Sequence, residues 1–135
     1  ADALHVIARE SGHDSWPKLK FAEEAARMDR AQKAERLKMA LYFGQHWIVR
    51  TLLDETPDLA RADFGLMCAL YDREGVAAVL SRDPGAATRT VGVRRPILHL
   101  AFSRQIHGDG TEADMLAVAE VLVAHGAEVD DSYPA

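Results

Sequence analysis

Apolar residues recur at helical spacing through most of the chain. The stretch from residue 45 to 56 is an example, because its apolar side chains follow the spacing i, i+1, i+4, i+5, which places them on one face of a helix. These side chains are Ile48, Val49, Leu52 and Leu53. Similar stretches alternate with turns that contain glycine or proline. The pattern therefore predicts an all-α fold.

Capping and turn residues set the limits of the predicted helices. Ser15 is typical of an N-cap, and Pro17 suits the first helical turn, where the missing N–H costs nothing. Gly12, Gly44 and Gly126 are each placed to end a helix, since glycine readily adopts the left-handed conformation of a C-terminal cap. After a short helix that ends near Gly12, the predicted helices cover approximately residues 15–28, 31–44, 45–56, 66–70, 76–82, 97–103 and 112–125.

The segments between these helices differ in character. Residues 59–65 are expected to form a connecting loop, and Gly75 is expected to open a turn. Residues 85–96 carry threonines and valines typical of a β-hairpin-like finger. Residues 105–114 form an insert that lacks the residue order of a calcium-binding loop. We therefore expect a surface loop followed by a helix capped at Thr111.

Three short segments resemble the ankyrin-repeat proteins of bacteria. Residues 96–101, P-I-L-H-L-A, are similar to the T-P-L-H-x-A opening of an ankyrin repeat. Residues 126–130 have the G-A-x-V-D pattern, and residues 8–20 include S-W-P-x-L-K, which resembles a segment that precedes the repeats. The resemblance implies an ankyrin-like solenoid of stacked helical hairpins, with residues 1–30 as an N-terminal helical cap. It implies about three degenerate repeats in one continuous domain, at residues 31–65, 66–96 and 97–135.

Composition narrows the possible partners and setting. The chain has 135 residues, a net charge of −5 and a single cysteine, so it forms no internal disulfide. That residue, Cys68, lies in an apolar run and is expected to be buried rather than nucleophilic. Residues 105–135 hold seven acidic side chains and no lysine or arginine, which argues against binding to nucleic acid phosphates. With no secretory signal and no membrane-spanning run, we expect a cytoplasmic location.

The arginines of the finger are the best candidates for a binding role. Arg89, Arg94 and Arg95, with Arg104 nearby, are expected to meet an acidic partner or a phosphate; the alternative is that they are only solvated loop residues. Alignment with other ankyrin stacks implies that two exposed aromatic anchors lie near the same surface, and these are Phe64 and Tyr71. The resemblance also implies a structural role for His99, which is expected to tie neighbouring turns together by hydrogen bonds.

Motifs for catalysis, metals or cofactors do not stand out in the sequence. No histidine pair has helical metal spacing, and no phosphate loop or nucleophile elbow is present. We therefore expect a protein–protein interaction scaffold without catalysis, cofactor or metal, and with no nucleic acid or membrane as partner. Two alternatives stay open. The chain is a regulatory or structural module of a longer enzyme or signalling chain, or it binds a small ligand or metal through the insert at 105–114.

Overall fold

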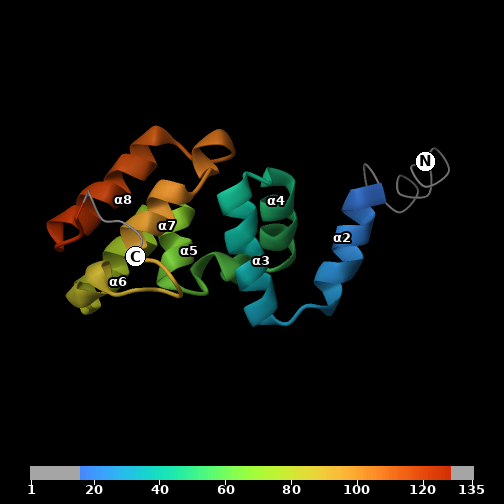
Figure 1. Cartoon of the computed structure of the whole chain (residues 1–135), viewed down its shortest axis with the longest axis horizontal. Coiled ribbons are helices and arrows are strands. Elements are labelled where there is room, and N and C mark those ends of the chain that lie inside the picture. Colours follow the sequence, from blue (N-terminus) through green and yellow to red (C-terminus); the bar gives the residue numbers. More distant parts are fainter. Residues whose placement is uncertain (1–15, 129–135) are drawn as a thin grey trace.

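The computed structural model describes residues 16–128, and this part of the chain is all-helical (Figure 1). The predicted helix before Gly12 lies outside the described residues. Seven α-helices and three short 3₁₀ helices follow one another, and within residues 16–128 no strand forms beyond an isolated bridge between Val91 and Arg94. The α-helices are α2 (Trp16–Arg27), α3 (Arg30–Phe43), α4 (His46–Glu55), α5 (Phe64–Ala69), α6 (Arg73–Arg82), α7 (Pro96–Phe102) and α8 (Glu112–Ala124). The 3₁₀ helices are η1 (Pro57–Arg61), η2 (Pro84–Thr88) and η3 (Gln105–His107).

Local capping chemistry explains most helix limits. Asp29 and Gln32 form a reciprocal capping box at the start of α3, and Gly44 ends that helix in the left-handed conformation, at φ 72°. Asp63 accepts a hydrogen bond from the backbone N–H of Leu66 and so caps α5. The expected cap at Thr111 is confirmed, since its side chain accepts from the N–H of Asp114.

Three expectations about the connectors are wrong or only partly right. The predicted loop at 59–65 is mostly helical, because Pro57 begins η1 and the cap at Asp63 starts α5 at Phe64. Gly75 lies inside α6 rather than in a turn, since the carboxylate of Asp72 caps that helix and accepts from the Gly75 N–H. The finger at 85–96 is not a full hairpin: η2 occupies its first part, and only the bridge at residues 91–94 remains.

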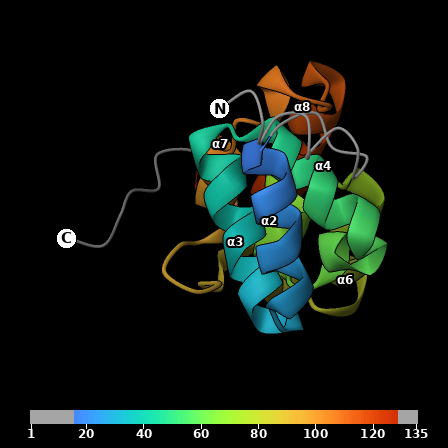
Figure 2. The same cartoon turned by 90° about the vertical axis from the view of Figure 1, so that its right-hand side faces the viewer.

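The helices pack as successive pairs. α3 contacts α4, α5 contacts α6, and α7 contacts α8, while α5 also contacts both α3 and α7, and α6 contacts α8. α2 packs on α4 at one end of the molecule, and α8 lies at the other end (Figures 1 and 2). Phe21 of α2 meets Trp47 of α4 edge to face, with ring centroids 5.6 Å apart.

Two clusters of buried side chains form the core. The first joins α2, α3, α4 and η1 to one side of α5, and its centre is fully buried at Leu37, Leu52 and Leu66. The second joins the other side of α5 to α6, η2, α7 and α8, with Val76 and Leu122 fully buried. Because α5 contributes to both clusters, it couples the two halves of the molecule.

The insert packs back onto the rest of the chain. The backbone N–H of Arg104, the residue just before the insert, donates to the carbonyl of Leu41 at 2.9 Å and so joins this segment to the end of α3. Gly110 lies so close to Tyr71 that a Cβ there would stand 2.6 Å from the ring, which explains the need for glycine at this position. The expectation of a surface loop is therefore incomplete, because part of the insert is η3 and its backbone contacts the core. Within residues 16–128, no helix is long and apolar enough to cross a membrane.

Candidate partner-binding surface

Most of the exposed large hydrophobic side chains lie together on one surface. Of the seven that are exposed within residues 16–128, five come from α3, the turn at residues 91–94 and the end of α7. We call these five side chains the aromatic face. They are Met39 (51% exposed), Tyr42 (40%), Phe43 (59%), Val93 (71%) and Phe102 (37%).

The register of α3 produces this face. Ala40 and Leu41 point into the core and are buried. Met39, Tyr42 and Phe43 follow the spacing i, i+3, i+4, which groups them on another side of the same helix. The ring of Phe43 is the most exposed of the three.

Aromatic contacts connect α3 to α7 across this face. The ring of Tyr42 meets Phe43 at 5.0 Å and Phe102 at 6.3 Å, both edge to face. The guanidinium of Arg94 lies 5.0 Å from the Tyr42 ring centroid and 5.2 Å from that of Phe102. Cation–π contacts of this kind hold the charge of Arg94 at the surface between the two rings.

His99 fixes the turn that carries Val93 and Arg94. Its Nε2 lies 2.8 Å from the carbonyl oxygen of Val91, and because that oxygen can only accept, Nε2 must carry the proton. The imidazole also lies against Gly65 of α5, where a Cβ would stand 2.9 Å from Nε2. Burial lowers the pKa of His99, against the opposing effect of the bond to Val91. The neutral ring therefore joins the turn, α7 and α5.

A pair of salt bridges lies at the edge of the aromatic face. The ammonium of Lys38 is 2.6 Å from Asp63 and 3.3 Å from Glu35. Burial alone would lower the pKa of Lys38, but the hydrogen bonds and charges of these two carboxylates together raise it. Since Asp63 also caps α5, the ion pair connects α3 to the start of α5.

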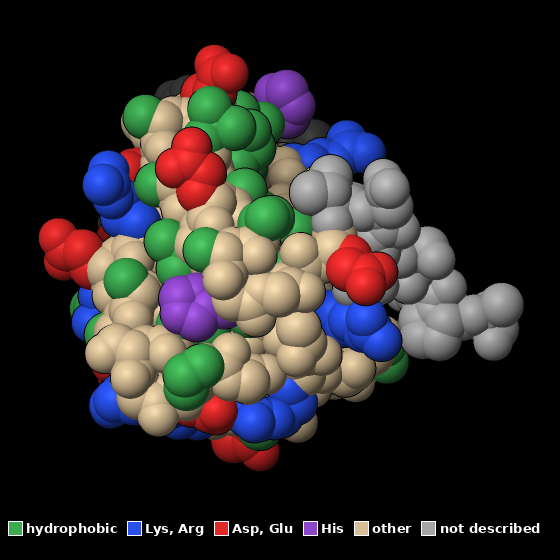
Figure 3. All heavy atoms as spheres, turned by 90° about the vertical axis from the view of Figure 1, so that its left-hand side faces the viewer, with side chains coloured by type: hydrophobic (Ala, Val, Ile, Leu, Met, Phe, Trp, Pro, Cys, Tyr) green, Lys and Arg blue, Asp and Glu red, His purple; other side chains and the backbone are tan. Residues whose placement is uncertain are grey.

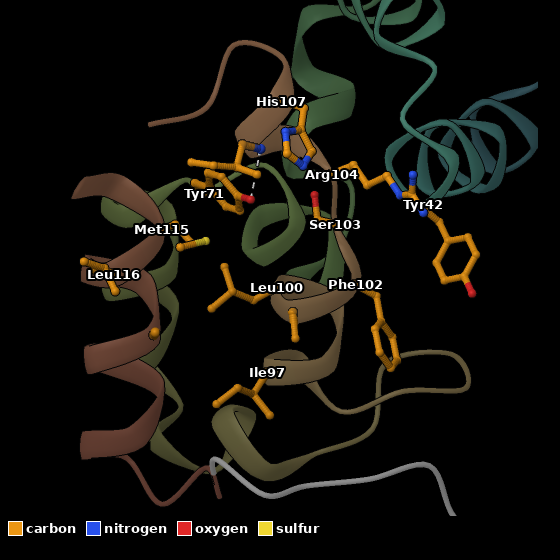
Figure 4. Close-up of a pocket in the computed structure, with 13 residues that line it drawn as sticks. Tyr42, Tyr71, Ile97, Leu100, Phe102, Ser103, Arg104, His107, Met115 and Leu116 are labelled. Carbon is orange, nitrogen blue, oxygen red and sulfur yellow. Dashed lines mark hydrogen bonds between the residues drawn. The ribbon is translucent and has the colours of Figure 1, made fainter. Parts of the chain in front are cut away.

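Two hollows adjoin the aromatic face. The first, of about 380 Å³, lies between α3 and the turn at 91–94 and is lined by Lys38, Met39, Tyr42, Phe43 and Val93 among others. The second, of about 590 Å³, lies between α7, η3 and α8 (Figure 4) and is lined mainly by apolar side chains such as Ile97, Leu100, Met115 and Leu116. Volumes of this size are typical of ligand and peptide-anchor sites.

The polar groups near the second hollow are largely engaged within the fold. The hydroxyl of Tyr71 accepts from the N–H of Ile106 at 3.1 Å (Figure 4). The hydroxyl of Ser103 donates to the carbonyl of Ala69 at 2.6 Å and accepts from the N–H of Gln105 at 3.2 Å. The hollow therefore offers mostly apolar surface, with charge supplied at its edge.

The predicted arginines do not form a single group. Arg94 lies in the aromatic face, and Arg104 extends toward Tyr42 at the edge of the second hollow (Figure 4). Arg89 instead pairs with Asp83 at 2.7 Å, at the junction of α6 and η2, and this hydrogen bond lowers the pKa of Asp83. Arg95 is exposed at the start of α7 but lines neither hollow.

The two predicted aromatic anchors are not exposed anchors. Tyr71 is only 4% exposed, because its ring belongs to the second core cluster and its hydroxyl bonds the insert. Phe64 is half-buried and packs against the same cluster at the start of α5. Sequence reasoning missed the aromatic face itself, although the i, i+3, i+4 spacing of Met39, Tyr42 and Phe43 was a usable signal.

The acidic side chains of the insert and the single cysteine have defined surroundings. Two acidic side chains of the insert face arginines, with Asp109 at 3.4 Å from Arg50 and Asp114 at 3.6 Å from Arg73. In the described part of the chain, no three histidine, cysteine or acidic side chains are grouped to hold a metal ion. The thiol of Cys68 is buried as expected, and burial raises its pKa.

Comparisons of this chain with protein-family models, with curated proteins and with solved structures find no match. The functional assignment therefore depends on the surface described above.

Proposed function

We propose that this chain is an ankyrin-like helical-repeat scaffold that binds another protein and has no catalytic activity of its own. The helix pairs α3–α4, α5–α6 and α7–α8 correspond to the three repeats implied by the sequence resemblance, and contacts from α3 to α5 and from α5 to α7 suit a stack of such pairs. A cytoplasmic setting is part of this proposal, since the one cysteine is a buried free thiol.

The observation that carries the proposal is the aromatic face. Soluble proteins rarely leave large apolar side chains grouped on the surface unless the group has a partner. Exposed tyrosine and phenylalanine rings beside an arginine are the side chains that contribute most energy to protein interfaces. Met39, Tyr42 and Phe43 supply such a group on a regular helix, and edge-to-face contacts pack the rings of Tyr42 and Phe43 together.

The end of the molecule formed by α8 provides a comparison surface. There, hydrophobic side chains show between isolated acidic and basic ones (Figure 3). Val123 of α8 is 42% exposed and lines none of the described hollows. It is therefore a matched control for an exposed apolar residue outside the aromatic face.

The test is selection of a random displayed peptide library on the immobilised full chain. We expect enriched peptides to bind the unaltered protein and the variant Val123→Ser, and to lose binding to the double variant Phe43→Ser, Val93→Ser. Phe43, Val93 and Val123 are all exposed. The unaltered chain, the double variant and Val123→Ser should therefore give the same circular dichroism spectrum. The proposal fails if no peptide is enriched, or if enriched peptides bind the double variant as well as the unaltered chain.

A further inference from the structure

A buried histidine holds the turn at residues 91–94, which carries part of the aromatic face. The connector that contains this turn projects from the helices as a loop (Figure 2). A Cβ at Gly92 would meet no described atom within 4 Å apart from its chain neighbours. The carbonyl of Val91 accepts two hydrogen bonds, from the Arg94 N–H at 3.4 Å and from Nε2 of His99 at 2.8 Å. The bond from His99 is the shorter of the two, and it joins the turn to α7.

Protonation of His99 would leave a buried donor without an acceptor. The residue is 8% exposed, and its ring packs on Gly65, where a Cβ would stand 2.9 Å from Nε2. Since Nε2 already donates to Val91, a second proton must go to Nδ1. No described residue forms a hydrogen bond with Nδ1. The charged ring would therefore carry an unpaired N–H in a buried site, which is costly.

The surroundings of the ring also disfavour its charged form. The charged and titratable groups that face it from the neighbouring elements are Glu35, Lys38 and Tyr42 of α3, Asp63 at the start of α5, and Arg94 of the turn. Burial is the largest cause of the lowered pKa of His99, and the charges of Lys38 and Arg94 lower this pKa further. The bond to Val91 and the charge of Asp63 oppose them without reversing the shift. His99 is therefore neutral in the fold at pH 7 and takes up its second proton below pH 6.5.

We propose that protonation of His99 releases the turn at 91–94 and so weakens partner binding at the aromatic face as the pH falls. A charged ring gains water for Nδ1 by turning toward the first hollow, which it lines, and this movement breaks the bond to Val91. Val93, which is 71% exposed, and Arg94, which lies against two rings of the face, then lose their fixed positions. This inference rests on the proposed function and adds a pH dependence to it.

The direction of the effect follows from linkage between binding and protonation. A partner that contacts the ordered turn favours the neutral ring, and by reciprocity the second proton weakens the partner. Because the pKa of His99 is lowered from 6.5, the affinity is complete above pH 6.5 and is lost as the pH falls below it. One linked proton changes the affinity by at most about tenfold per pH unit.

The test measures the affinity of a library-selected peptide that depends on Phe43 and Val93, by fluorescence anisotropy on the full chain. The peptide is N-acetylated and chosen to lack histidine and acidic residues, so its own charge is constant between about pH 5 and pH 7.5. We expect about fivefold weaker binding at the lower pH. His99→Gln, whose amide can still donate to Val91 but does not titrate, should remove this difference. The control His125→Gln, at an exposed position after α8, should retain it.

Amide NMR spectra test the same change without a partner. In the unaltered chain, the signals of Gly92 and Val93 should move as the imidazole of His99 titrates, and in His99→Gln they should stay in place. The inference is overturned if the imidazole does not titrate above pH 5, or if it titrates and these amides do not move. A pH-dependent affinity that persists in His99→Gln also overturns it.

The proposed function and this inference fail in different ways. A peptide that depends on Phe43 and Val93 but binds equally well at both pH values refutes the pH dependence and leaves the scaffold function supported. If the library yields no binder at all, the scaffold function fails, and the pH-dependent binding fails with it.

Discussion

Replacing Tyr71 by phenylalanine tests whether this tyrosine stabilises the fold or binds the partner. The sequence resemblance makes Tyr71 an exposed anchor, whereas the structure buries its ring and bonds its hydroxyl to the insert. Its backbone is also in the left-handed region, at φ 60°, which is uncommon for a bulky residue. Burial raises the pKa of Tyr71, against the opposing hydrogen bonds from Ile106 and Ser103. Tyr71→Phe keeps the ring and the backbone conformation and removes only the hydroxyl.

The size of the effect follows mainly from loss of the acceptor for the Ile106 N–H, because the Ser103 hydroxyl keeps its hydrogen bond to the carbonyl of Ala69. Without the hydroxyl, the N–H of Ile106 has no acceptor in the described structure, and the site is partly buried. Leaving a donor unpaired in such a site costs about 1–2 kcal/mol of unfolding free energy. Packing adds little, because phenylalanine fills the same space against Gly110.

Urea unfolding measures this cost, and Tyr42→Phe is the matched control. The control removes a hydroxyl from a ring that is 40% exposed, and we expect its unfolding free energy to change by less than about 0.5 kcal/mol. Tyr71→Phe should lower the midpoint with an unchanged slope, since the surface exposed on unfolding is the same. Peptide affinity should stay within about twofold for Tyr71→Phe. An unchanged stability together with weaker peptide binding would refute the structural assignment and restore Tyr71 as an anchor.

Two further predictions concern the groups that position the binding surface. The pKa of His99 is lowered in the fold from its usual 6.5, so the neutral ring contributes stability that is complete above pH 6.5 and is lost as the pH falls below it. His99→Gln, whose amide can still donate to Val91, should show a shallower fall in melting temperature over this range; an identical pH dependence would show that other groups cause it. Asp63→Ala should cost about 1–2 kcal/mol of unfolding free energy because it removes a helix cap as well as the partner of Lys38, whereas Asp63→Asn keeps a capping side chain and should cost less. Equal losses in urea unfolding would mean that the ion pair, not the cap, holds the start of α5.

Helix limits were predictable where the deciding residues are neighbours in sequence. Gly44 ends α3 and Thr111 starts α8 through bonds within a few residues, and both were found from the sequence. Gly75 was misplaced because glycine usually marks a turn, while here the cap at Asp72 starts the helix earlier. The limits of α6 thus depend on a residue whose importance becomes clear only when its hydrogen bond is seen.

The binding surface was less predictable because it depends on tertiary contacts. α3 is apolar on more than one side, and only the packing of α4 and α5 decides that Leu41 is buried while Phe43 is exposed. Arg94 could be proposed from the sequence because a cation in a connector has few structural roles. Its position between two rings could not, since Tyr42 and Phe102 come from helices far apart in the chain.

The insert at 105–114 shapes the second hollow without contributing to the aromatic face. The residue just before it, Arg104, is bonded through its backbone to Leu41 at the end of α3, and Asp109 pairs with Arg50 of α4. Its η3 segment forms one wall of the larger hollow, where the hydroxyl of Tyr71 holds it in place. A segment expected to be a surface loop, with a metal site as the alternative, is thus bonded to α4 and to Tyr71. The anchoring of this insert, together with Arg104 just before it, therefore shapes the edge of the second hollow.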